Sequence, residues 1–311
     1  MSRLVELRDM LDETASTVAR LEQAIASDPK SPSLFAMLKS VEKRRGNLEE
    51  EFLTETHSVG IDVCSYRLFG DFERPTIAAI SKALGGFQTL VTVVYDAVKS
   101  SVPKLRARVG ADIENETAFH FGYAFSGSLG VVLTIPNQRL LMGESDLDKT
   151  FRTIFNMAKA QNSSEILEFA RVLGPAPVRM MYQWAFDHAR HGLGVDIEWR
   201  RETHIQAKLF AQKQELENLY STIESTSEET VTEAVVEGTL EGADVPRRSF
   251  HIVLDNGEDI RGLFLDAISN DQTVELPKRY RAILTKRSKI FYSTEREETS
   301  YFLNRLEGSP N

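Results

Sequence analysis

Apolar residues at the start of the chain recur at alternating spacings of three and four, which predicts helices with one narrow apolar stripe. A polar turn containing Pro29 and Pro32 separates two such stripes. We therefore predict an antiparallel helical hairpin of coiled-coil type over residues 1–56. The first stripe comprises Leu4, Leu7, Leu11, Thr14, Val18, Leu21 and Ile25, and the second comprises Leu34, Leu38, Val41, Arg45, Leu48 and Phe52.

The turn also predicts which residues of the two helices face each other. Folding the chain back at the turn places Thr14 and Arg45, the one polar residue of each stripe, in the same layer. A single polar layer commonly fixes the register of a coiled coil at some cost in stability. Asp12 and Glu13 lie near this layer, so we expect one of them to pair with Arg45.

Three more apolar side chains of the hairpin, Met10, Phe35 and Met37, fall outside the two stripes. They are available to contact the rest of the chain or a second copy. Two helices alone bury little surface, which favours association between copies. We expect a homo-oligomer, in the first place a dimer.

The sequence pattern of residues 57–200 predicts a mixed α+β module. After an expected loop around residues 60–75, Pro75 opens an apolar helix that passes through Gly85 and Gly86. Two glycines inside a helix are unfavourable, so they mark a kink, a close backbone contact or a break between two helices. Ser145 and Asp148 have the spacing of a capping box at the start of a further helix.

Strands and two more helices complete this module. A β-hairpin is predicted around a turn at residues 126–130, with alternate aromatic side chains on one face. Helices are predicted over residues 164–173 and 177–191, and the segment GVDIEWR reads as one more strand. The alternating aromatic residues are Phe119, Phe121, Tyr123 and Phe125.

The last part of the chain changes to a period of two. Residues 201–228 predict an acidic linker in which a helix extends from about 202 to 225. Residues 229–311 predict a small β-barrel of SH3-like or OB-like type, made of five short strands and followed by a terminal helix at EREETSYFLNRLE. The expected fold class is therefore a multi-domain α+β protein with a coiled-coil hairpin, a mixed α+β middle module and a C-terminal barrel.

Composition narrows the classes of function and compartment. The 311 residues carry a net charge of −9, whereas a protein that coats nucleic acid is normally basic. Cys64 is the only cysteine, which fits a reducing compartment, and no apolar stretch has the length of a membrane span. The first residues are too acidic for a signal peptide, so we expect a cytoplasmic location without membrane association.

Each candidate for catalytic chemistry has a simpler structural interpretation. The glycine-rich turn with Ser126 and Ser128 lacks the motif of a P-loop or a nucleophile elbow. His188 and His191 could share a metal ion, but no second pair of ligands is visible, and a histidine near a helix C-terminus is favourable by itself. Cys64 is interpreted as a buried, inert thiol. We expect no catalytic residue, no metal site and no cofactor, and we favour a protein that is not an enzyme.

One basic run remains as a candidate binding surface. Several of its side chains share one face of the expected strand, while Tyr280, Ala282 and Leu284 take the other face. The run could be a solvated face, a contact for the acidic linker, or a weak site for a polyanion or a protein partner. Its residues are Lys278, Arg279, Arg281, Lys286, Arg287 and Lys289.

These observations favour a non-enzymatic regulatory or scaffolding protein. It would self-associate through the coiled coil and bind another protein through the middle module and the barrel. The alternative is a protein that senses nucleic acid or a nucleotide with the basic face of the barrel. A hydrolase built on the aromatic hairpin is a third interpretation.

Overall fold

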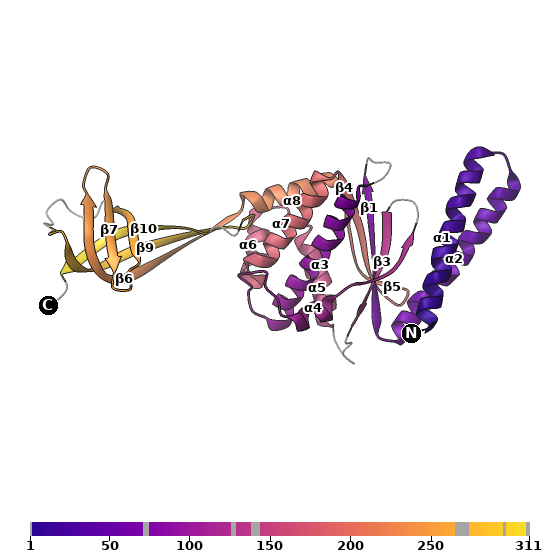
Figure 1. Ribbon diagram of the computed structural model, residues 1–311, viewed down its shortest axis with the longest axis horizontal. Helices are drawn as coiled ribbons and strands as arrows, with labels where there is room; N and C mark the ends of the chain where they lie inside the picture. The colour runs from indigo at the N-terminus through magenta and orange to yellow at the C-terminus, as the bar shows by residue number, and fades with distance from the viewer. Residues whose placement is uncertain are drawn as a thin grey trace. The chain divides into compact units, whose positions relative to one another are not determined.

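The computed structural model describes residues 2–70, 75–125, 129–137, 144–264, 274–294 and 297–308. These residues form a mixed α+β structure with eight helices and two β-sheets, one of which is a closed five-stranded barrel (Figure 1). The chain divides into two compact units, Met1–Thr226 and Ser227–Asn311. The helical hairpin therefore belongs to the same unit as the middle module.

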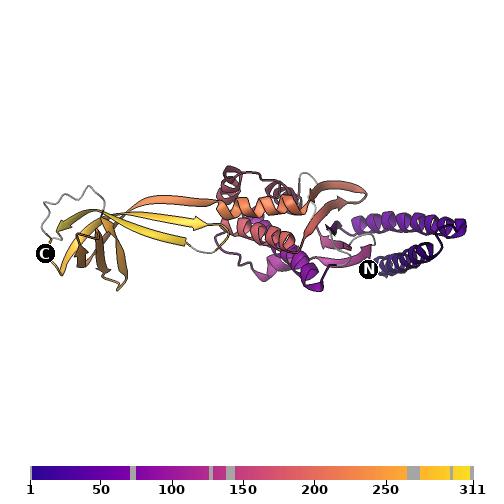
Figure 2. The ribbon, with the colours of Figure 1, turned by 90° about the horizontal axis from the view of Figure 1, so that it is seen from above.

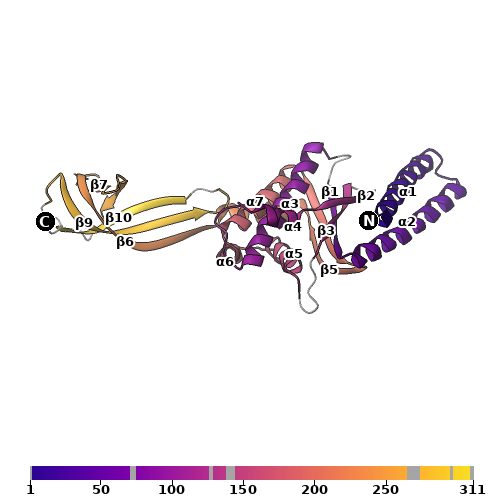
Figure 3. The ribbon, with the colours of Figure 1, turned by 60° about the horizontal axis from the view of Figure 1, so that its bottom comes forward.

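Helices α1 (Ser2–Ser27) and α2 (Pro32–Ser58) lie side by side in every view (Figures 1 and 3). Leu7, Leu11 and Val18 are buried, as their apolar stripe predicts. Thr14 is also buried, and its hydroxyl donates to the carbonyl of Met10 at 2.6 Å. Arg45 pairs with Glu49 on its own helix at 3.4 Å, not with Asp12 or Glu13, because a residue one turn further along the helix is within easy reach.

The hairpin rests on a five-stranded antiparallel sheet. Strand order is β2-β3-β1-β4-β5, so β1 lies at the centre between β3 and β4. The bounds are β1 Ile61–Gly70, β2 His120–Phe125, β3 Leu129–Pro136, β4 Leu193–Arg201 and β5 His204–Ala211. The strands β2, β3 and β4 confirm the sequence prediction.

Two predictions for this unit are wrong. The segment expected as a loop is the central strand β1, in which the buried Cys64 and Tyr66 alternate with Ser65 and the exposed Arg67. The expected helix over residues 202–225 is strand β5 followed by helix α8 (Lys213–Ser225). Gln212 separates the two, since it forms a capping box with Glu215 at the start of α8.

Helices cover one face of the sheet and the hairpin lies on the other (Figure 1). Helix α3 (Ile77–Ser100) is continuous through Gly85 and Gly86, and a side chain at Gly86 would lie 3.7 Å from the ring of Trp184. This is an ordinary van der Waals distance, so the packing of the helices does not require a glycine at this position. Ser145 and Asp148 form the predicted capping box of α5. The remaining helices are α4 Ala111–Thr117, α5 Asp146–Met157, α6 Ser163–Leu173 and α7 Pro175–Arg190.

By length and composition alone, α3 could cross a membrane, and it is the one such helix in the described part of the chain. Its most apolar stretch has a mean hydropathy of 1.5. The core helix of a globular domain has the same properties. Phe87, Leu90, Val91 and Val94 of α3 are fully buried, so the helix is weak evidence for a membrane span.

A buried hydrogen-bonded group joins the sheet to α7. The Tyr66 hydroxyl lies 2.8 Å from Nε2 of His188 and accepts from Nε1 of Trp184 at 3.0 Å. Nδ1 of His188 lies 2.7 Å from the carbonyl of Trp184, which places the ring proton on Nδ1. Burial lowers the pKa of His188 to about 4, so the ring is neutral near pH 7.

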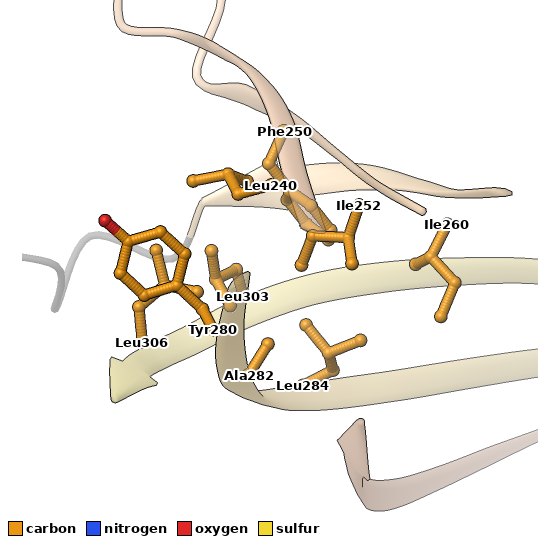
Figure 4. Close-up of a cluster of buried hydrophobic side chains, with 9 residues drawn as sticks. All are labelled: Leu240, Phe250, Ile252, Ile260, Tyr280, Ala282, Leu284, Leu303 and Leu306. Carbon is orange, nitrogen blue, oxygen red and sulfur yellow. The ribbon is translucent and has the colours of Figure 1, made fainter. Parts of the chain in front are cut away.

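The second unit is a closed barrel with strand order β10-β8-β7-β6-β9. Strand β10 pairs in parallel with β8 and antiparallel with β9. Nine buried apolar side chains point toward one another between the strands (Figure 4). The bounds are β6 Ser227–Asp244, β7 Ser249–Leu254, β8 Asp259–Phe264, β9 Lys278–Phe291 and β10 Glu297–Gly308.

The strands that form the barrel differ from the prediction in two ways. The segments expected as two separate strands after residue 278 form the single strand β9. The expected terminal helix is strand β10, which pairs with β9 along most of its length. Its Glu, Leu and Arg residues favour a helix locally, but pairing between two strands overrides that preference.

Three strands continue beyond the closed barrel. Strand β6 pairs with β9 from Ser227 onwards, whereas its pairing with β7 begins only at Gly238. Strand β9 thus lies between β6 and β10 in a three-stranded antiparallel sheet (Figure 2). We call this part of β6, β9 and β10, residues 227–237, 285–291 and 297–300, the strand extension.

Candidate functional site

A hollow of about 250 Å³ lies between α2 and the sheet face that the other helices leave uncovered. We call it the sheet groove. Its floor comes from β1, β2, β3 and β4, and its wall comes from Glu49 and Leu53 of α2. The antiparallel register places Ser65 and Arg67 of β1 on the same face as Glu198 and Asp196 of β4, their direct partners.

Apolar packing holds the wall against the floor. Phe52 of α2 meets Tyr123 of β2 edge-on, with ring centroids 5.3 Å apart. Leu7 and Leu11 of α1 belong to the same buried cluster, together with Val63 and Val132 of the sheet. A rigid wall and floor are what a preformed binding surface requires, since little ordering is then needed on binding.

Most charges on the groove are paired. Glu198 accepts from Nζ of Lys208 at 2.7 Å and from Nε of Arg200 at 2.9 Å. Burial alone would raise the pKa of Glu198, but the hydrogen bonds from Lys208 and Arg200 outweigh burial and lower it. Burial raises the pKa of Glu49 against the opposing charges of Arg45 and Arg200.

Arg67 differs from the other cations around the groove. Within the described ranges, no carboxylate lies within 4.0 Å of its guanidinium, and its side chain is exposed. The opposite residue on β3 is Gly130, which adds no side chain beside it. Five donors in a planar fork are thus available to a carboxylate or phosphate of a ligand.

A second hollow of about 250 Å³ lies beside Arg201, at the other face of β4. Nη2 of Arg201 lies 3.2 Å from Oδ2 of the fully buried Asp62 and 2.7 Å from Oδ2 of Asp148. Asn137 donates to the same oxygen of Asp62 at 2.6 Å. Trp199 donates to Asp148 at 2.9 Å. These contacts fasten β1, β4 and α5 together, so we interpret the group as structural.

The six bases of the barrel do not form an open cationic surface. The predicted faces are confirmed, because Tyr280, Ala282 and Leu284 are buried while Arg279 and Arg281 are exposed. Four of the bases have an acidic neighbour within 4.0 Å. These pairs are Lys278 with Glu275, Arg279 with Glu237 and Asp255, Arg281 with Glu307, and Arg287 with Glu229.

The other two bases lie in the strand extension. Nζ of Lys289 sits over the ring of Phe291 at 4.8 Å, and its register partners are Glu229 and Glu298. Lys286 is half-buried on the opposite face of β9. The acids near this basic run come from neighbouring strands and from the connections between strands of the same unit.

The three apolar residues expected to mediate association are not brought together. Met10 packs against the cluster at the base of the hairpin. Phe35 and Met37 are exposed on α2, near the turn that joins the two helices. At that end Ile25 and Leu34 of the stripes are only half-buried, whereas Leu7 and Leu11 at the base are fully buried.

The remaining sequence candidates have structural surroundings where they are described. Cys64 is buried, as predicted, and burial raises the pKa of its thiol. His188 is fully buried and contacts Tyr66 and, one helical turn earlier, the carbonyl of Trp184. Ser126 and Ser128 lie outside the described residues. No group of three metal-ligating side chains comes together among the residues that the structure places.

The aromatic hairpin departs from its predicted alternation. The register between β2 and β3 shifts between Phe121 and Tyr123, so one residue is unpaired and the side chains change faces. Tyr123 is buried at the groove, whereas 57% of Phe121 is exposed. A hydrolase site on one continuous aromatic face therefore lacks its structural basis.

Sequence reasoning missed Arg67, Arg201 and Asp62. No local spacing marks them, because each gains its role from strands and helices far away in the sequence. In comparisons with models of known families, with curated proteins and with solved structures, the chain matches none.

Proposed function

We propose that this is a non-enzymatic regulatory or scaffolding protein that binds a protein partner in the sheet groove. The observation that carries the proposal is the exposed Arg67, which has no acidic partner among the described residues and lies in the same hollow as the apolar side chains of Val63, Tyr123 and Val132. Such a surface suits a segment that presents an apolar side chain next to a carboxylate. The barrel serves as a second binding surface.

Replacing Arg67 with alanine tests the groove. The full-length protein and its Arg67→Ala variant are used to capture partners, with nuclease present, and the captured proteins are identified by mass spectrometry. Loss of one hydrogen-bonded charge should weaken binding about tenfold. A partner that binds the wild type and loses about tenfold in measured Kd with Arg67→Ala supports the proposal.

Arg106→Ala is the matched control, because Arg106 is also exposed and its guanidinium has no acidic partner in the described chain. It should leave the Kd unchanged. Equal capture by all three proteins would contradict binding in the groove. Capture that disappears on nuclease treatment would favour the nucleic-acid alternative instead.

Self-association through the hairpin is the other part of the proposal. It is supported by the exposed Phe35 and Met37 and by the half-buried stripe residues near the turn. We expect the double substitution Phe35→Ser and Met37→Ser to change the mass from dimer to monomer in light scattering at micromolar concentration. The control is Val172→Ser, since Val172 is also an exposed apolar residue, lies on α6 and should not alter the mass. A wild-type monomer at tens of micromolar would contradict this part.

We interpret the barrel as OB-like and not as SH3-like. The basis is the parallel pair between β8 and β10, the third and fifth strands of the barrel. Nucleic-acid binding through the basic run has less support, because acids of neighbouring strands lie close to its bases. Pairing of this kind reduces the counterion release that drives binding to phosphates.

A further inference from the structure

The strand extension has a long unpaired edge. Strand β6 pairs with β9 along residues 227–240, but with β7 only along residues 238–244. Over residues 227–237 its second edge has no strand partner in the described chain. At about 3.3 Å per residue this edge is about 36 Å long. An unpaired edge presents a row of free backbone donors and acceptors.

The edge lacks most of the features that usually prevent an unpaired strand from pairing with another chain. Residues 227–237 contain no proline, no lysine and no glycine, and their register with β9 has no bulge. Val231 and Val235 are 58% and 49% exposed, and Thr230 and Thr232 are also exposed. Residues of this kind favour a further paired strand. The one protection is negative charge, from four glutamates.

The charge pattern of the extension indicates which strand would fit. Basic β9 lies between the acidic segments of β6 and β10, and Lys289 is opposite both Glu229 and Glu298. Nε of Arg287 lies 3.9 Å from Glu229. Opposite charges on neighbouring strands stabilise a sheet, and like charges destabilise it. The pattern acid–base–acid would continue with a basic strand beyond β6.

Glu233 is the acid that this pattern leaves uncompensated. Glu229 and Glu237 each have an arginine of β9 within 4.0 Å, whereas Glu233 is opposite Thr285 and is exposed. On one face of β6 these three glutamates recur every fourth residue. A neighbouring strand with basic residues at the same spacing would face all three.

We propose that the free edge of β6 binds an extended basic segment of a partner protein, which adds a fourth strand to the extension. The main-chain hydrogen bonds give general affinity, and the three glutamates select lysine or arginine at every fourth position. This proposal names the ligand of the second binding surface and so rests on the proposed function. A second copy of the chain is a poorer occupant, since it would place its own acidic edge against this one.

The test uses the full-length protein and fluorescein-labelled peptides in an anisotropy titration at low salt. The peptide KTVTKTVTK, aligned antiparallel, places its lysines opposite Glu237, Glu233 and Glu229. We expect measurable binding at peptide concentrations up to about 1 mM. The peptides ETVTETVTE, which reverses the charge, and KTVTKPPTK, which keeps the charge but removes backbone donors, should not bind.

Two substitutions on the same strand locate the site. Glu233→Lys should weaken binding of KTVTKTVTK about fivefold, because it replaces an attraction with a repulsion. Glu241→Lys is the matched control, since Glu241 is exposed on β6 but lies outside the free edge, at the bulge in the pairing of β6 with β7. It should change the Kd by less than about twofold.

Three results would overturn the proposal. They are no binding of KTVTKTVTK, equal binding of KTVTKPPTK, and equal effects of the two substitutions. A change in oligomeric mass on Glu233→Lys would instead assign the edge to a second copy and also refute the basic-peptide proposal. A negative result with these peptides would not change the expected outcome of the Arg67→Ala experiment. The proposal for the edge of β6 can therefore be refuted without refuting the proposal for the sheet groove.

Discussion

Replacing Phe87 with alanine is expected to lower the free energy of unfolding of the first unit by about 3–5 kcal/mol. Phe87 is fully buried on α3. Its ring centroid lies 4.9 Å from Tyr66, 5.7 Å from Phe119 and 6.4 Å from Trp184. Truncation would open a cavity where the sheet and two helices meet, and rigid aromatic neighbours cannot fill it.

Tryptophan fluorescence in a urea titration measures this effect selectively. The two tryptophans of the chain, Trp184 and Trp199, both lie in the first unit, so unfolding of the barrel does not contribute to the signal. Phe121→Ala is the control, because that ring is 57% exposed and should cost less than about 1 kcal/mol. A loss below about 1 kcal/mol for Phe87→Ala would mean that the aromatic cluster is not the core of the unit.

Arg201→Ala is the second substitution with a large expected effect, a loss of about 3–5 kcal/mol at pH 7. The guanidinium lies between the carboxylates of Asp62 and Asp148, and the side chain of Asp62 is fully buried. Without Arg201 the buried carboxylate of Asp62 and the carboxylate of Asp148 both lose a charged partner. The same fluorescence titration measures the loss.

The effect of Arg201→Ala should depend on pH. Burial alone would raise the pKa of Asp148, but hydrogen bonds from Trp199, Arg201 and Ser145 outweigh burial and lower it. A carboxyl with a lowered pKa stabilises the folded state above its unfolded pKa of about 4 and loses that contribution as pH falls through the folded value. The difference between wild type and Arg201→Ala should therefore shrink between pH 7 and pH 3.

Two further variants distinguish the effect of losing the buried contacts of Arg201 from the effect of losing a surface charge. Adding Asp62→Asn to Arg201→Ala should restore part of the stability, since it removes the buried negative charge. Arg152→Ala should cost less than about 1 kcal/mol, because the ion pair of Arg152 with Glu144 is largely exposed on the arginine side. Equal losses for Arg201→Ala and Arg152→Ala would contradict a structural role for the buried group.

The helical hairpin and the barrel strands could be predicted because their patterns are local. Leu7, Leu11 and Val18 recur at helical spacing and are buried on one side of α1. In β9, Tyr280 and Ala282 alternate with exposed arginines on a strand that is covered on one face. A single buried face leaves a clear period in the sequence.

The elements that were missed have either a period of two that is too short or a misleading local preference. In β1 the buried Cys64 and Tyr66 alternate with polar residues over only a few positions, which does not distinguish a strand from a loop. In β10 the register shifts between Leu303 and Arg305, which breaks the period of two in a segment rich in helix-forming residues.

The candidate sites could not be predicted for a different reason. Arg201 is 139 positions from Asp62 and 53 from Asp148, and the pair distances depend on the sheet and on α5. Arg67 is notable only in the structure, because its direct strand partner Asp196 pairs with Lys208 of β5 instead. The unpaired edge of β6 follows from where β7 begins to pair, which no pattern within β6 indicates.

The central position of β1 has a consequence for the order in which the protein folds. Strand β1 precedes its partners β3 and β4 by about 70 and 130 residues, respectively, as their register shows. On the ribosome, β1 therefore has no partner for several seconds at typical rates of synthesis. The hairpin of α1 and α2 needs only local contacts and forms earlier. The apolar side chains at the base of the hairpin can then pack against Val63 of β1 before the sheet has formed.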